Sequence, residues 1–119
     1  APIMLRQKQG SFINFSTIAV ALALKGESVY AASKAGVESF SRTFAREMAD
    51  FNLRVNCIAP GPIRTDLLRG ITDAQIEKIT SQQVIQKQFQ KSDVCDLVEL
   101  LLDEKATSLS GQVLNVGGV

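Results

Sequence analysis

A tyrosine and a lysine one helical turn apart are the residues of this sequence best suited to chemistry. Tyr30 and Lys34 are separated by three small residues, and positions i and i+4 of a helix lie on the same face. A fixed positive charge beside a phenol stabilises the phenolate, which makes the phenol a better proton donor near neutral pH. The sequence contains no histidine, which excludes Ser-His-Asp and Cys-His catalysis and most zinc sites. Acid–base chemistry must therefore come from Tyr, Lys, Asp or Glu, and we predict no metal site.

The hydrophobic pattern predicts the elements that position this pair. We expect a strand over residues 11–15, a helix over 29–51, a strand over 53–58, a helix over 92–103 and a strand over 111–116. Apolar strands that alternate with helices indicate a parallel sheet covered by helices, so the predicted fold class is α/β. At 119 residues the chain has no room for two cores, and we expect a single domain over residues 1–119.

The connecting segments and the helix faces complete this prediction. We expect residues 18–27 to form a loop over a cavity and residues 73–90 to form a mobile helical flap. Ser28 and Ser92 are the predicted N-caps of the two long helices. Apolar residues at helical spacing are interpreted as core-facing: Val37, Phe40, Phe44 and Met48 on the first helix, and Val94, Leu97, Val98, Leu101 and Leu102 on the second.

The composition narrows the classes of partner. The net charge is +1 and the basic residues do not cluster, so we expect no nucleic-acid surface. The longest fully apolar run, residues 18–24, is far shorter than the roughly 20 residues needed to cross a bilayer, so we expect no membrane partner. Cys57 and Cys95 lack a Cys-x-x-Cys spacing, and we interpret them as buried, reduced thiols of a cytoplasmic protein.

Several motifs in a fixed order give the chain a family resemblance. They are Asn14-x-Ser16-Thr17, Tyr30-Ala-Ala-Ser-Lys34, Arg54-Val55-Asn56, Pro60-Gly61-x-Ile63-x-Thr65 and Gly117-Gly118. With these motifs the chain resembles the C-terminal half of the short-chain dehydrogenase/reductases, and within that family it is most similar to bacterial-type 3-oxoacyl-(acyl-carrier-protein) reductases. The resemblance implies the C-terminal half of a Rossmann-like, doubly wound parallel sheet. The family's glycine-rich phosphate-binding turn is absent from this sequence, so we expect the chain to be part of a longer polypeptide.

The resemblance also implies roles for individual residues. Tyr30 would exchange a proton with the substrate oxygen, and Lys34 would hold the ribose hydroxyls of a nicotinamide cofactor. The family has a catalytic serine thirteen positions before the tyrosine, and that position is Thr17 in this sequence. Threonine offers the same hydroxyl. Ser16 is the fallback, although neighbours on an extended strand point to opposite faces.

Cofactor and substrate contacts follow from the same resemblance. The implied cofactor contacts are Tyr30, Lys34, Pro60, Gly61, Ile63 and Thr65. The substrate pocket is expected to be apolar, with Ala19, Leu67 and Leu68 among its lining residues and Val20, Leu22 and Leu24 in the facing wall. NADP is the expected cofactor, with NAD as the alternative.

The resulting hypothesis is NAD(P)H-dependent reduction of a ketone, such as a 3-oxoacyl thioester or another small molecule. Lys8 matches one of two basic positions that the carrier-protein reductases use for docking, whereas the other position is Phe51. A generic ketone substrate therefore stays open. The alternative is a non-catalytic fragment or interaction module that is inactive without the N-terminal half. A homo-dimer or homo-tetramer is expected, because the Tyr30 helix and the closing strand belong to the elements through which the resembling enzymes associate.

Overall fold

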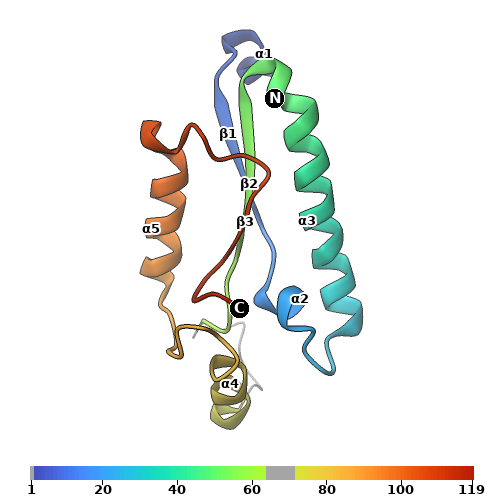
Figure 1. The fold of residues 1–119 in the computed structure, drawn as a ribbon, viewed down its shortest axis with the longest axis vertical. Coiled ribbons are helices and arrows are strands. Elements are labelled where there is room, and N and C mark those ends of the chain that lie inside the picture. Colours follow the sequence, from blue (N-terminus) through green and yellow to red (C-terminus); the bar gives the residue numbers. More distant parts are fainter. Residues whose placement is uncertain (1, 64–71) are drawn as a thin grey trace.

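Three parallel strands with a long helix on each face form the fold (Figure 1). This computed structural model describes residues 2–63 and 72–119. Its elements are α1 (Pro2–Gln7), β1 (Gly10–Phe15), α2 (Ile18–Leu22), α3 (Ser28–Met48), a 3-10 turn (Ala49–Phe51), β2 (Leu53–Ala59), α4 (Asp73–Thr80), α5 (Lys91–Leu102), a second 3-10 turn (Glu104–Ala106) and β3 (Val113–Asn115). The strand order is β1-β2-β3, which confirms the predicted α/β class with a parallel sheet.

The two faces of the sheet pack against different helices, because side chains alternate across a strand. On one face, Ile58 joins Leu101 of α5 and Val116 in a buried cluster, with Ile13 and Leu114 packed against it. This face is the apolar core, and it confirms the core-facing prediction for Leu101, although Leu102 is 56% exposed.

The opposite face of the sheet meets α3 through polar contacts. Asn14 Nδ2 donates to Ser41 Oγ at 2.8 Å, and the Cys57 thiol donates to the same oxygen at 3.1 Å. The buried residues of α3 are Glu38, Ser41 and Ala45. The side chains through which α3 packs on the sheet are therefore small or polar.

The predicted core-facing stripe of α3 is wrong for Phe40, whereas Val37, Phe44 and Met48 are half-buried. Phe40 is 58% exposed and stacks on Phe44, with ring centroids 5.2 Å apart. Phe44 in turn makes an edge contact with Phe12 of β1 at 5.4 Å. Hydrogen bonds to β1 and β2 allow Ser41 to be buried, so the aromatic stripe turns toward the edge of this face instead of into the core.

Several predicted boundaries also differ from the structure. The expected loop over residues 18–27 contains α2, because Thr17 Oγ1 accepts the Ala19 N–H at 3.3 Å and caps a helix. The N-cap of α3 is Glu27 rather than Ser28, which is the first helical residue. The N-cap of α5 is Gln90 rather than Ser92, and its N–H donates to Asp93 Oδ2 at 2.7 Å.

Shorter elements account for the remaining differences. In the predicted flap the helix ends at Thr80, and the closing strand spans only Val113–Asn115. Both cysteines are free, but Cys95 is exposed, which contradicts the prediction of two buried thiols. Across residues 2–63 and 72–119, no helix is both long and apolar enough to cross a membrane. The same residues hold no group of three His, Cys, Asp or Glu side chains that could bind a metal ion.

One end of the sheet gathers the predicted site residues. The carboxyl ends of β1 and β2 point to the same end of the molecule because the strands are parallel. In Figure 1, α2, the start of α3 and α4 lie around that end. In open α/β sheets this edge is where ligands bind.

Candidate active site

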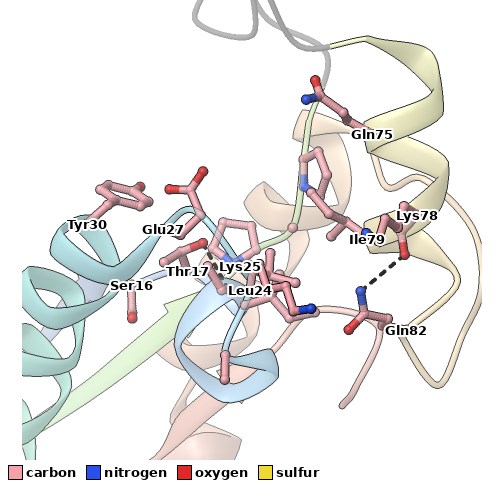
Figure 2. Close-up of a pocket in the computed structure, with 16 residues that line it drawn as sticks. Ser16, Thr17, Leu24, Lys25, Glu27, Tyr30, Gln75, Lys78, Ile79 and Gln82 are labelled. Carbon is pink, nitrogen blue, oxygen red and sulfur yellow. Dashed lines mark hydrogen bonds between the residues drawn. The ribbon is translucent and has the colours of Figure 1, made fainter.

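A cleft of about 700 Å³ opens at the carboxyl end of the strands (Figure 2). This volume lies within the range of sites that bind small molecules. Its lining residues come from the end of β1, α2 and the segment after it, the start of α3, the segment after β2, and α4: Ser16, Thr17, Ile18, Ala19, Ala23, Leu24, Lys25, Glu27, Tyr30, Pro60, Gly61, Pro62, Gln75, Lys78, Ile79 and Gln82.

Two of the predicted catalytic hydroxyls border this cleft. Tyr30 lies in the first turn of α3 and is 49% exposed, and Thr17 lies between β1 and α2. Figure 2 shows both side chains beside the same open space. The Thr17 oxygen already accepts the Ala19 N–H, so its own proton is available to donate to an oxygen in the cleft.

Lys34 lies one turn after Tyr30 on α3 and is half-buried. Its Nζ donates to the carbonyl oxygen of Phe15 at 3.3 Å, which joins the helix to the end of β1. An ammonium has three donors, so two remain for other acceptors. Lys34 itself does not line the cleft.

Ser16 borders the cleft but directs its hydroxyl away from Thr17. The Ser16 side chain is buried, and its Oγ donates to Glu38 Oε2 on α3. In Figure 2 the Ser16 side chain points away from the Tyr30 ring. Of the two predicted hydroxyls, that of Thr17 is therefore the one placed to meet a ligand.

The segment after β2 forms another wall of the cleft and packs on a buried glutamine. A Cβ atom at Gly61 would lie 2.7 Å from Gln83 Oε1, so only glycine fits at this position without movement. Gln83 is itself held in place, because its Nε2 donates to the carbonyl oxygens of Ile85 and Lys87 at 3.1 Å each. Pro60 and Gly61 line the cleft, as the prediction of a cofactor contact requires, whereas Ile63 does not.

The predicted apolar pocket is only partly present. Ala19 and Leu24 line the cleft, but Val20 and Leu22 do not. Polar side chains take up much of the wall instead: Lys25, Glu27, Gln75, Lys78 and Gln82. Ile76 of α4 turns inward and is 6% exposed, while Gln75, Lys78 and the half-buried Ile79 of that short helix line the cleft. The predicted residues Thr65, Leu67 and Leu68 lie outside the described residues.

Two buried polar residues near the site were missed at the level of sequence. Glu38 continues the row of Tyr30 and Lys34 along α3 at four-residue spacing, and that spacing is a signal that could have found it. Gln83 lies in a polar stretch with no motif, and the sequence gives no sign that it would be 4% exposed.

Comparison with known proteins places this geometry in a family. The family described as enoyl-(acyl carrier protein) reductase matches residues 1–118. The chain therefore belongs to this family, which is of the short-chain dehydrogenase/reductase type, and the predicted resemblance is confirmed.

Named relatives agree with this assignment. The chain is 35% identical over 117 residues to a 3-oxoacyl-(acyl-carrier-protein) reductase of Staphylococcus aureus, covering 98% of this chain and 48% of the relative. It is 32% identical over 117 residues to the reductase of the same name from Thermotoga maritima, with the same two coverages. The chain thus spans about half the length of the curated relatives it matches.

A solved structure shows the same fold at high similarity. A short-chain type dehydrogenase/reductase from Mycobacterium ulcerans superposes with a TM-score of 0.87 at 31% identity, covering 95% of this chain and 42% of that protein. A 3-oxoacyl-(acyl-carrier-protein) reductase from Brucella melitensis gives a TM-score of 0.84 at 25% identity, covering 99% of this chain and 45% of that protein. The fold of this chain is therefore part of a Rossmann-like sheet.

Proposed function

We propose that the full-length protein carrying this chain is an NAD(P)H-dependent reductase that converts a ketone, such as a 3-oxoacyl thioester, to the alcohol. The observation that carries the proposal is the placement of the Thr17 hydroxyl and the Tyr30 phenol on one cleft at the carboxyl end of the sheet. Membership of a reductase family and the names of the relatives support the same reaction class.

Lys34, beside the cleft, and the segment after β2, which lines it, fit a nicotinamide cofactor. Lys34 keeps two N–H donors after bonding Phe15, which suits the paired hydroxyls of a ribose. Pro60 and Gly61 border the cleft, and we assign them to contact with the nicotinamide ring. When bound, such a cofactor supplies the hydride. We propose NADP as the cofactor, because the relatives are named as reductases.

The chain's own residues then handle the substrate oxygen. The Thr17 hydroxyl donates a hydrogen bond to the carbonyl oxygen and orients it. The Tyr30 phenol donates its proton to that oxygen as negative charge develops there. Lys34, one turn further along α3, would hold the ribose hydroxyls of the cofactor with its remaining N–H donors.

We also propose a cytoplasmic homo-dimer or homo-tetramer that associates through α3. The exposed Phe40 ring, stacked on Phe44, supports this, because exposed aromatic pairs are common in interfaces. Size-exclusion chromatography with light scattering of the full-length protein measures the state, and a monomer would contradict it.

Replacement of Tyr30 by Phe tests the proposed function. In the full-length protein, Tyr30→Phe is expected to lower kcat for carbonyl reduction about a thousandfold, because the phenol proton is lost while the ring remains. NADPH binding, followed by fluorescence titration, is expected to stay within about twofold of the wild-type protein. Reduction at the wild-type rate by the variant would overturn the proposal.

A second candidate function is an interaction module that is stable only when paired. β1 is hydrogen bonded to β2 on one edge, and within the described residues no strand covers its other edge. An open strand edge is a template for pairing with another strand. If the 119-residue chain binds no NADPH and becomes ordered only with a second polypeptide, this candidate replaces the first.

A further inference from the structure

The end of β1 is tied to α3 by two hydrogen bonds next to the catalytic hydroxyls. Lys34 Nζ donates to the backbone oxygen of Phe15, and Ser16 Oγ donates to Glu38 Oε2. Lys34 and Glu38 are one turn apart on α3 and continue the row that begins at Tyr30. The end of the strand and the catalytic face of the helix are therefore joined directly.

Thr17 lies between two residues whose backbones are fixed to the neighbouring segment. The Ser16 N–H donates to the Ile58 oxygen at 2.9 Å, and the Ile18 N–H donates to the Pro60 oxygen at 3.1 Å. These bonds set the position of Thr17 relative to β2. The position of Thr17 relative to Tyr30 depends on what joins this segment to α3. Two bonds do so: that from Lys34 to Phe15, and that from Ser16 to Glu38, directly beside Thr17.

Glu38 is an unusual residue to find at such a point. It is 8% exposed, and Ser16, which is 5% exposed, donates to it. In the described part of the chain Glu38 makes no ion pair. A buried carboxylate without an ionic partner is costly, and an apolar residue at this position would normally give a more stable packing. The presence of a glutamate at position 38 is thus better explained by the segment that it positions than by a contribution to the stability of the fold.

We propose that Glu38 is a positioning residue for the reaction: by accepting the Ser16 hydroxyl, it sets the separation between the Thr17 hydroxyl and the Tyr30 phenol. The proposal rests on the proposed function, since it assigns these two hydroxyls to one substrate oxygen. A displacement of about 1 Å in such a pair is enough to reduce a rate about a hundredfold.

The experiment compares four variants of the full-length protein. Glu38→Ala and Ser16→Ala each remove the bond, Glu38→Gln keeps an oxygen that accepts the serine hydroxyl, and Glu47→Gln is a matched control at an exposed position of the same helix. We expect Glu38→Ala and Ser16→Ala each to lower kcat about tenfold or more with KM within about threefold of wild type. Glu38→Gln is expected to retain most of kcat.

A double variant separates the bond from the two residues. If both act through one hydrogen bond, Ser16→Ala combined with Glu38→Ala lowers kcat no further than either single change. The positioning role would be overturned if the losses in kcat were additive, or if Glu38→Gln lost as much kcat as Glu38→Ala. A rise in KM parallel to the loss in kcat would also overturn it. Wild-type kcat in all four single variants would also overturn it.

Amide hydrogen exchange tests the anchoring of this segment independently of catalysis. In the Glu38→Ala variant the amides of Ser16 and Ile18 are expected to exchange at least about tenfold faster, while Glu47→Gln leaves them unchanged. If the wild-type protein reduces no ketone, the proposed function fails, and this measurement still decides whether Glu38 holds the segment. Unchanged exchange in Glu38→Ala refutes the anchoring itself.

Discussion

The wall of the cleft formed by β1 and α3 is held by hydrogen bonds that reach into the buried sheet, whereas the wall formed by α4 presents mostly exposed polar side chains. On the first wall, Ser16, the neighbour of Thr17, donates hydrogen bonds to Glu38 and to the Ile58 carbonyl oxygen. Lys34 donates a hydrogen bond to the end of β1. The first wall is therefore built to keep two hydroxyls in place.

The α4 wall depends on fewer contacts with the rest of the molecule. Ile76 is the buried residue of this eight-residue helix, and the helix start is stabilised locally by reciprocal bonds between Thr72 and Gln75. Lys78 is exposed at the cleft, and Lys25 faces the same cleft from the other side. Side chains on this wall can change without disturbing the sheet, so we expect it to set substrate preference while the first wall sets the reaction.

The largest effect that tests this contrast is expected at Thr17. Thr17→Ala removes the hydroxyl that we propose orients the substrate oxygen, and we expect kcat of the full-length protein to fall about a hundredfold. Thr17→Ser keeps the hydroxyl and is expected to recover most of that loss. Steady-state kinetics measures both variants, and circular dichroism checks that Thr17→Ala, which also loses the cap of α2, remains folded. A Thr17→Ala protein with wild-type kcat would mean that the hydroxyl has no role in the reaction.

A smaller effect is expected at the two exposed lysines that line the cleft, Lys78 on the α4 wall and Lys25 across from it. Lys25→Gln and Lys78→Gln are each expected to raise KM for an anionic acyl thioester about twofold to fivefold, with kcat unchanged, because exposed charges contribute only weakly. The difference should shrink at high salt, since screening weakens exposed charge pairs. KM measured at two ionic strengths checks this.

Two controls sharpen the lysine prediction. Lys91→Gln changes an exposed lysine of α5 that does not line the cleft, and its KM should match the wild type. A neutral ketone should show the same KM in all variants. If Lys78→Gln instead lowered kcat, the expectation that the α4 wall sets only substrate preference would be wrong.

These two walls also differ in how well the sequence predicts them. The sequence spacing predicts that Thr17 and Tyr30 lie near each other, because Thr17 follows the end of a strand and Tyr30 lies at the start of the helix, and that Lys34 lies one turn after Tyr30. The structure places Thr17 and Tyr30 on one cleft. The alternation of apolar strands and helices likewise predicts the parallel sheet. Both features depend on local periodicity, which a single sequence contains.

The α4 wall and the neighbouring segment after β2 are harder to predict, because their few contacts with the rest of the molecule are tertiary and periodicity does not contain them. The inward turn of Ile76 and the burial of Gln83 against Gly61 follow from how distant segments meet. The same reason explains the error on α3. From the sequence alone, Glu38 and Ser41 are expected at the surface and Phe40 in the core. The hydrogen bonds of Glu38 and Ser41 to the β1 and β2 segments reverse this, because they bury these two residues and leave Phe40 exposed.

The smallest expected effect concerns the polar layer beneath the first wall. Burial raises the pKa of the Cys57 thiol above its ordinary value near 9.0, and the nearby charge of Glu38 acts in the same direction, while the bond to Ser41 and the charge of Arg42 oppose it. The folded protein therefore holds the thiol proton to higher pH than the unfolded chain does. As pH rises above about 9, the unfolded state ionises first, so stability should fall in the interval between the two pKa values.

Thermal melting from about pH 7 to about pH 10.5 measures this effect of Cys57. The wild type is expected to lose Tm more steeply above about pH 9 than Cys57→Ala does, whereas Cys95→Ser, at an exposed thiol, should follow the wild-type slope. Equal slopes in Cys57→Ala and wild type would show that the thiol beneath the β1–α3 wall is not protected from ionisation. The polar layer that joins β1, β2 and α3 would then be more accessible to water than its hydrogen bonds imply, and the first wall would be less rigid.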